Sequence, residues 1–353
     1  MLTEISNTPI MAKPRKHHFV QAEHIRQFVN EEGTVWVYAK NGKQFQMSPE
    51  AIFKQKDLNS YESEAGLDTQ FEDYITGFEN ETFPAIKRVN ENEAIRESDI
   101  VPLTAYVALS KIRNPSLQSG IIAHHRNTVT TVAKMLDRRG DFAEMPDIPN
   151  FENKTMTELL NEGLLEFEIN NSVYLDRIHD MTKQTNKLLA NHFGWSLVKS
   201  PRDRVIISDH PMSIVHPGQH FAAYGIPLGG ADCEVAFPLS RSLYLLGLWH
   251  REVEDVESED IVDELNRRQC LFANRHIAVS NPRRSWQQLA ARYSNFGYQT
   301  LANSVDYGSG ALEVITGGVF LLEDRPMHQG THPLKLTRSV GKRLKDKPAR
   351  QVT

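Results

Sequence analysis

The amino-acid sequence predicts an α+β fold in which a helical first half packs with a mainly antiparallel sheet and a short hairpin lies near the N-terminus. Apolar residues recur at helical spacing over much of residues 67–193, whereas residues 204–249 contain apolar runs of strand length. Neighbouring strand-like runs are joined by turn-forming residues, which favours antiparallel pairs. Helices first and strands later is the order typical of α+β proteins rather than of alternating α/β proteins.

The region before the long helices is predicted to hold a short helix, a hairpin and another short helix. Residues 18–29 show helical spacing, and residues 34–39 and 43–47 alternate as strands do. The Asn-Gly pair at 41–42 between these strands is typical of a type I′ turn. The Ser-Pro-Glu sequence at 48–50 favours a helix start, with serine as N-cap and proline in the first turn.

An amphipathic pattern then predicts a helix over residues 67–89, and two further helices are predicted over residues 100–112 and 118–136. Residues 141–153, which contain two prolines, are expected to form a long loop or a boundary that subdivides the domain. A capping-box pattern opens residues 155–193, and this pattern predicts one long helix over that range.

The last part of the chain is predicted to be richer in strands. Residues 204–208 form a compact apolar strand, and residues 234–249 are typical of a hairpin. A helix is expected over residues 258–274, because a serine N-cap precedes two acidic residues in the first turn. Another helix is expected over residues 285–295, opened by a Ser-x-x-Gln capping box, and one or two short strands over residues 303–322.

The composition excludes several classes of protein. The 353 residues include 40 Lys+Arg and 45 Asp+Glu, for a formal net charge of −5, which is ordinary for a soluble globular protein. No apolar run approaches the roughly 20 residues that span a membrane, so no membrane association is expected. Cys233 and Cys270 are too few for a disulfide framework and favour reduced thiols in a cytoplasmic protein.

A single α+β domain is predicted over residues 16–325, between a flexible leader at 1–15 and a basic tail at 326–353. From residue 334 onwards the tail has seven Lys or Arg residues and one acidic residue. Few large apolar groups are present to offset the entropy of ordering, so we expect the tail to be disordered. Removal of residues 334–353 should then leave the fold intact. Such a tail is either an arm for nucleic acid or a solvated tail.

The sequence motifs of several common enzyme classes are absent. There is no GxGxxG, GxxxxGK[ST], HExxH or GxSxG, which argues against dinucleotide-binding enzymes, P-loop NTPases, zincins and α/β-hydrolases. The histidines at 210, 216 and 220 match no fixed metal-site template in their spacing, so solvated loop residues are the simpler interpretation. Asp209 ends an apolar strand, where it either lines a cleft or caps the turn.

A series of short motifs runs along most of the chain. In order, the motifs are His17-His18-Phe-Val, Ile25-Arg-Gln-Phe28, Val35-Trp-Val-Tyr38, Phe78-Glu79-x-x-x-x-Pro84-Ala-Ile86, Ala108-Leu-Ser-Lys-Ile-Arg113-Asn-Pro115, Ile207-Ser208-Asp209-x-Pro211, Phe237-Pro238-Leu239-Ser240 and Asn274. The series resembles the bacterial family catalogued as domain of unknown function 4238. The chain departs from the family pattern at Gln21, where a proline is expected, and at Asn114, where a threonine is expected.

The resemblance implies one polar set drawn from distant parts of the chain, namely His17, His18, Glu79, Arg113 and Asp209. An imidazole can act as a base or a metal ligand, a carboxylate as its partner and a guanidinium as a clamp for an anion. The set would therefore suit a hydrolytic or phosphodiester-cleaving site, with or without a divalent metal. It would equally suit a buried network that holds the N-terminal segment on the helices.

Two functional hypotheses of different classes stay open at this point. One is a hydrolase of the nuclease type, with His17, His18 and Asp209 at its centre and Arg113 on phosphate. Its partner would be nucleic acid or another phosphate-bearing ligand. The other is a non-catalytic sensing or interaction protein in which the same set is structural. In both, the set should come together in space, and Arg113 should be partly buried and paired with a carboxylate, preferably Glu79.

Overall fold

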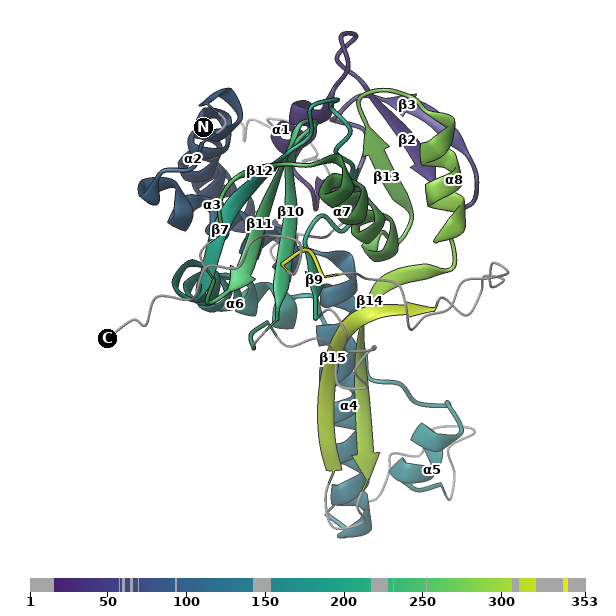
Figure 1. Ribbon diagram of the computed structural model, residues 1–353. Coiled ribbons are helices and arrows are strands. Elements are labelled where there is room, and N and C mark those ends of the chain that lie inside the picture. The colour runs from purple at the N-terminus through teal and green to yellow at the C-terminus, as the bar shows by residue number, and fades with distance from the viewer. Residues whose placement is uncertain are drawn as a thin grey trace, which may run out of the picture.

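The structure, a computed structural model of the chain, confirms the α+β class, with a layer of helices beside mainly antiparallel sheets (Figure 1). The leader at 1–15 and most of the predicted boundary and tail lie outside the described residues. The structure describes residues 16–56, 58, 61–63, 66–68, 70–92, 94–141, 154–216, 228–230, 232–251, 253–306, 311–321 and 339–341.

A five-stranded sheet forms the centre of the molecule. Its strand order is β12-β7-β11-β10-β9, and neighbours are antiparallel except β12 and β7. The predicted hairpin over 234–249 is confirmed, with Phe237 opposite Leu245 across its two strands. The strands are β7 (Phe193–Lys199), β9 (Ser213–Val215), β10 (Glu234–Ser240), β11 (Leu243–Trp249) and β12 (Val256–Glu257).

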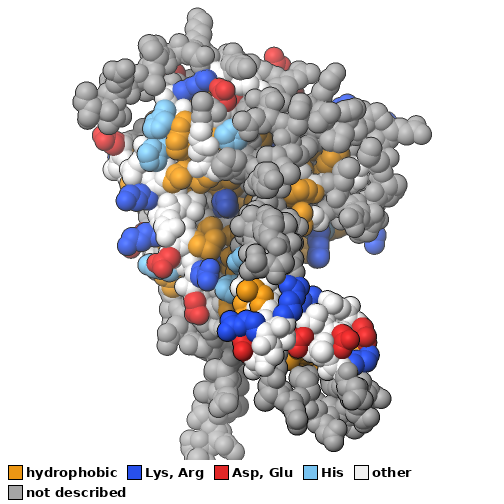
Figure 2. All heavy atoms as spheres, turned by 90° about the horizontal axis from the view of Figure 1, so that it is seen from below, with side chains coloured by type: hydrophobic (Ala, Val, Ile, Leu, Met, Phe, Trp, Pro, Cys, Tyr) orange, Lys and Arg blue, Asp and Glu red, His pale blue; other side chains and the backbone are white. Residues whose placement is uncertain are grey.

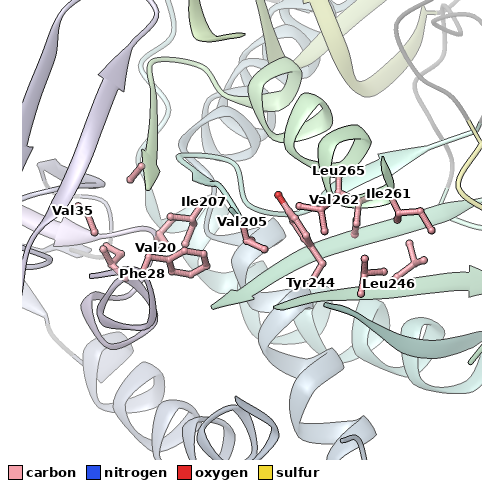
Figure 3. Packing of buried hydrophobic residues seen from close by; sticks show 14 of the residues in the cluster. Val20, Phe28, Val35, Val205, Ile207, Tyr244, Leu246, Ile261, Val262 and Leu265 are labelled. Atoms are coloured by element: carbon pink, nitrogen blue, oxygen red, sulfur yellow. The ribbon is translucent and has the colours of Figure 1, made fainter. Parts of the chain in front are cut away.

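Both faces of the central sheet are buried, which explains the continuous apolar run of β11. On one face, Leu245 packs against residues of the helices α2 (Gln70–Asn92), α3 (Glu97–Ile112) and α6 (Ser172–His192). On the opposite face, Tyr244 packs against α7, which spans Glu259–Phe272 (Figure 3). Successive residues of a strand point to opposite faces, so each strand contributes to both core clusters. Full burial of one large apolar side chain stabilises the fold by about 1.5–3 kcal/mol.

A second sheet joins the N-terminal region to the middle and the end of the chain. Its order is β3-β2-β13-β8, and all of its neighbours are antiparallel. The short strands β1 and β4 pair separately, beside α1 (Ala22–Ile25) and η1 (Arg26–Phe28). The strands are β1 (Lys16–His18), β2 (Val35–Ala39), β3 (Gln44–Met47), β4 (Lys54–Lys56), β8 (Ile207–Ser208) and β13 (His276–Val279).

An arm extends from this body (Figure 1). It consists of α4 (Pro115–Arg138), on which the hairpin of β14 (Phe296–Asp306) and β15 (Ala311–Leu321) packs. The helix α5 (Met156–Asn161) also contacts α4. The remaining elements are α8 (Arg284–Arg292) and the paired strands β5 (Tyr61–Ser63) and β6 (Gly66–Asp68).

Two predictions for the N-terminal region are wrong in detail. The β2–β3 hairpin exists, but residues 40–42 form a three-residue loop closed between Ala39 and Lys43, and Gly42 alone has a positive φ, of 87°. A type I′ turn needs a positive φ at both central residues, so the turn is the three-residue type instead. Residues 48–50 form a single turn and not a helix.

The helix expected over residues 155–193 is two helices. The capping box of Thr155 and Glu158 is present at the start of α5. That helix ends at Asn161, and Gly163 just after it has a φ of 68°, the left-handed conformation common after a helix C-terminus. An extended segment follows, and α6 begins only at Ser172.

The structure differs from the sequence prediction in four further places. Strand β7 begins where the long helix was expected to end, and the helix expected from residue 67 starts at Gln70. Strand β13 follows α7 at once and was not expected. Helix α8 begins at Arg284, so Ser285 lies inside the helix and is not its N-cap.

Three residues of the expected tail pack against the body. Val340 is fully buried in the core cluster beside α7. The backbone N–H groups of Val340 and Gly341 and the hydroxyl of Ser339 donate to the Glu234 carboxylate at 2.8–3.1 Å. Removal of residues 334–353, which was expected to leave the fold intact, would remove these buried contacts.

Candidate functional site

His18 lies on β1 and is half-buried. Its Nε2 atom lies 3.3 Å from the carbonyl oxygen of Pro49. Burial, followed by the charge of Lys54, its partner across β1 and β4, lowers the pKa of His18 to about 4. The imidazole is therefore neutral near pH 7, where it can accept a proton only weakly.

Arg113 joins the N-terminal strand to the helices. It is the C-cap residue of α3 and is 2% exposed, which is deeper than the partial burial that the sequence predicted. Its Nη2 donates a 2.5 Å hydrogen bond to the backbone carbonyl of His18, so a carbonyl is one of its partners. Burial raises the pKa of Tyr106; the charge of Glu79 raises it further and that of Arg113 lowers it. The charges of Glu79 and Arg113 therefore both influence the pKa of the Tyr106 hydroxyl, and Arg113 also contacts the strand of His17 and His18.

Asp209 serves as an anchor for the turn between α7 and β13. Its carboxylate accepts backbone N–H bonds from Asn274 at 2.7 Å, Arg275 at 2.6 Å and His276 at 3.0 Å. Its own N–H donates to the carbonyl of His276 at 3.1 Å. The sequence left open whether Asp209 lines a cleft or caps a turn, and these hydrogen bonds show that its carboxylate stabilises a turn. Asp209 and Asn274, two residues of the family-like motifs, are thereby in direct contact.

Asn114 connects Asp209 to the helices. Its side chain accepts from the N–H of Ser116 at 2.9 Å as the N-cap of α4, and its Nδ2 donates to the carbonyl of Asp209 at 3.2 Å. The family pattern has threonine here, and asparagine and threonine are both common N-caps. The departure therefore preserves the helix start, and it links Asp209 to the residue next to Arg113.

A cleft of about 1220 Å³ opens between the N-terminal strands, the start of α4, the α7–β13 turn and β14. Of the five residues of the predicted set, Asp209 lines it, whereas the other four do not. The lining residues are Phe19, Val37, Phe45, Met47, Ala51, Ile52, Phe53, Lys54, Gln55, Lys56, Asn114, Pro115, Ser116, Ser119, Asp209, Asn274, Arg275, His276, Tyr298, Gln299, Thr300 and Leu301.

Positive charge predominates among the ionisable residues of this lining. Lys54, Lys56 and Arg275 are exposed, and one carboxylate, that of Asp209, faces them from a buried position bound to three amides. The pKa of His276 is lowered mainly by its burial; Asp209 acts to raise it and Arg275 to lower it. On the face seen in Figure 2, charges of both signs are interspersed.

The sequence did not predict the three cations of the cleft. Lys54 and Lys56 alternate along β4, and Arg275 lies in a turn more than 200 residues away. Only the pairing of β2 with β13 places the turn next to the N-terminal strands. The family-like motifs contain Asn274, and this residue is the one feature that pointed towards the turn.

His210 is not the solvated loop residue that the sequence suggested. It is 2% exposed, and its ring lies 4.0 Å from the Tyr298 ring and 5.6 Å from the Phe272 ring, measured between centroids. Burial lowers its pKa to about 3, and the charge of Lys111 also lowers it. This histidine is therefore a neutral aromatic residue of the core.

Two kinds of feature are absent from the described residues. No three His, Cys, Asp or Glu side chains in the described ranges are grouped so that they could hold a metal ion. No helix in the same ranges combines the length and the apolar character needed to cross a membrane.

Comparison with known proteins gives one match. A family model described as "Protein of unknown function (DUF4238)" matches residues 16–283. No curated protein and no solved structure gives a significant match.

Proposed function

From the premise that the chain belongs to the DUF4238 family of proteins of unknown function, we propose that it binds a phosphate-bearing ligand in the cleft. The observation that carries this proposal is the lining of the cleft, in which three exposed cations face a single buried carboxylate. Lysine and arginine are the side chains that most often bind phosphate oxygens.

Two further features support an anionic ligand. The Asp209 carboxylate accepts three backbone N–H bonds, which spread its negative charge over the turn. The N-cap Asn114 and the α4 residues Pro115, Ser116 and Ser119 line the same cleft, and the N-terminus of a helix favours negative charge. Both features lower the repulsion that a phosphate would otherwise meet from Asp209.

Hydrolysis of such a ligand, as by a nuclease, stays a prediction from the sequence. The geometry changes the candidate for its base, because His17 and His18 do not line the cleft and the Asp209 carboxylate holds backbone amides. His276 is the imidazole in the lining, and burial keeps it neutral near pH 7, which a base requires.

The structural role of the original polar set favours a binding function without catalysis as the second candidate. Arg113 holds the carbonyl of His18, and Asp209 holds the turn at 274–276. These contacts stabilise the walls of the cleft and need no reacting ligand.

Titration of a fluorescein-labelled oligonucleotide and competition by inorganic pyrophosphate test the proposal. We expect Lys54→Gln, Lys56→Gln and Arg275→Gln each to weaken binding severalfold and to reduce its dependence on salt. Lys87→Gln and Arg139→Gln are matched controls, because both side chains are more than 70% exposed and lie outside the cleft. Equal losses in the two groups of variants would show nonspecific attraction and would contradict a site in the cleft.

A further inference from the structure

The cleft has an apolar wall in addition to its cations. Along β3 the side chains of Gln44 and Gln46 are exposed, whereas those of Phe45 and Met47 are half-buried and line the cleft. The alternation follows from the geometry of a strand. Both apolar residues pack against the core cluster on one side, and their other side faces the cleft. The cleft therefore offers apolar surface as well as charge.

Aromatic rings form part of this wall. The rings of Phe45 and His276 lie 6.0 Å apart between centroids at an interplanar angle of 75°, and those of Phe19 and Phe53 lie 6.1 Å apart. His276 follows Arg275 in the same turn, so the aromatic wall and a cation meet there. A ligand at this junction would contact a ring and a guanidinium together.

We infer that the phosphate-bearing ligand of the cleft is a nucleotide unit, with its base on the Phe45 side and its phosphate on the cations. This inference rests on the proposed function and deepens it. Every nucleobase has a planar face that stacks on aromatic side chains, and proteins that hold nucleotides without reading a sequence combine such stacking with a cationic groove. Inorganic phosphates and sugar phosphates have no planar apolar face, so they would leave the wall in contact with water.

The size of the cleft agrees with this ligand. Pockets for small molecules usually measure about 300–1,000 Å³, and the cleft of about 1220 Å³ is slightly larger. The volume accommodates a free nucleotide or one unit of a single-stranded oligonucleotide. These two sources share the chemistry of recognition and are separated by experiment.

Calorimetric titration with ATP, inorganic triphosphate and an eight-nucleotide single-stranded DNA tests the inference. We expect ATP or the DNA to bind the wild-type protein at least about tenfold more tightly than triphosphate, which corresponds to the stacking of one base. Phe45→Leu should remove that difference and leave triphosphate binding within about twofold. Phe45→Trp should preserve it, because tryptophan also stacks on a base.

The controls separate this inference from the proposed function. Phe78→Leu replaces a half-buried phenylalanine outside the cleft and should leave all three affinities unchanged. Lys54→Gln should weaken all three probes alike. If triphosphate binds as tightly as ATP and the DNA, the nucleotide inference is overturned while the phosphate site stands. If none of the probes binds, both proposals fail. If ATP and the DNA compete with each other, they share one site. The one that binds more tightly then indicates whether the natural ligand is a free nucleotide or a single-stranded nucleic acid.

Discussion

Asp209 shows how one buried carboxylate can fix the wall of a cleft. Its three bonds to the N–H groups of residues 274–276 hold the turn that carries Arg275 and His276 into the lining. A buried donor that loses its partner costs about 1–3 kcal/mol. The position of these two side chains therefore depends on a residue that need not touch the ligand.

Replacement of Asp209 by asparagine should destabilise the protein by about 3 kcal/mol, because an amide NH₂ group would face backbone N–H donors. Urea unfolding measures the change. Asp203→Asn is the matched control, since the Asp203 side chain is 43% exposed and the residue has a φ of 50°, a conformation that asparagine tolerates. Equal losses in the free energy of unfolding for the two substitutions would show that the three hydrogen bonds of Asp209 do not stabilise the protein.

The buried histidines should make the protein sensitive to acid. The pKa values of His24 and His210 are lowered to about 4 and about 3, mainly by burial, from an ordinary value of 6.5. The unfolded chain therefore binds more protons than the folded one between pH 6.5 and the folded pKa. Stability should fall as the pH drops through this window, by up to about 1.4 kcal/mol per pH unit for each group.

Denaturation curves at pH 7, 6 and 5 test this expectation. His210→Phe should make the loss of stability less steep, because phenylalanine can occupy the place between Phe272 and Tyr298 without a titrating group. His192→Gln, at an exposed position, should leave the slope unchanged. A slope that stays the same in His210→Phe would mean that other groups dominate the acid response.

At the scale of elements, the contact between α4 and β14 depends on a glycine. A Cβ atom on Gly120 would lie 2.9 Å from the carbonyl oxygen of Thr300 and closer still to its side chain. Gly120→Ala should therefore displace β14 and lower stability by about 1–3 kcal/mol. Thr300 lines the cleft, so ligand binding should weaken as well.

A second glycine provides the control for this substitution. Gly77 lies within α2, and a Cβ there meets nothing within 4 Å. Gly77→Ala should stabilise the helix by about 0.5–1 kcal/mol, since alanine loses less backbone freedom on folding. The melting temperatures of the two variants should therefore shift in opposite directions, and a shift in the same direction would refute the close contact.

The segment 339–341 should be part of the folded structure. Glu234 is 2% exposed and binds the buried Arg268 at 2.6 Å as well as the three donors of this segment. Deletion of residues 339–353 should leave this carboxylate short of donors, remove buried Val340, and cost about 3 kcal/mol or more. Deletion of residues 342–353 alone should cost less than about 0.5 kcal/mol. Thermal melting compares the two deletion variants. Equal melting temperatures would show that residues 339–341 do not stabilise the fold.

At the scale of the whole molecule, local patterns predicted elements whose stability is local. The capping boxes, the β10–β11 hairpin and the amphipathic helices α3 and α4 each follow from residues within one short window. The break at Gly163 was missed because the apolar stripe continues across it. Strand β13 was missed because its stability comes from β2, more than 200 residues earlier in the chain.

The candidate site was harder to predict for the same reason. The resemblance to the family indicated Asp209 and Asn274, and the structure brings them into contact. It did not indicate Lys54 or Arg275, because neither belongs to a pattern and only the fold places them together. Arg113 was correctly expected to be buried, but its carbonyl partner on His18 depends on how β1 lies against α3.

The arrangement of the cleft leads to a prediction for the whole chain. Its lining includes residues of four segments that lie far apart in sequence, at 54–56, 114–119, 274–276 and 298–301. A ligand at 100 times its Kd stabilises the folded state by about 2.7 kcal/mol, and a ligand that spans the cleft must slow the opening of all four walls. Hydrogen–deuterium exchange should therefore show slower exchange in these segments together when ATP is added.

The variant Lys54→Gln is the control for this experiment, since at the same ATP concentration it should show less protection in every segment. Protection confined to residues 54–56 would indicate a ligand attracted to surface lysines alone. That result would rule out a site that spans the N-terminal strands and the arm, because the walls at 274–276 and 298–301 would then exchange as they do without ligand.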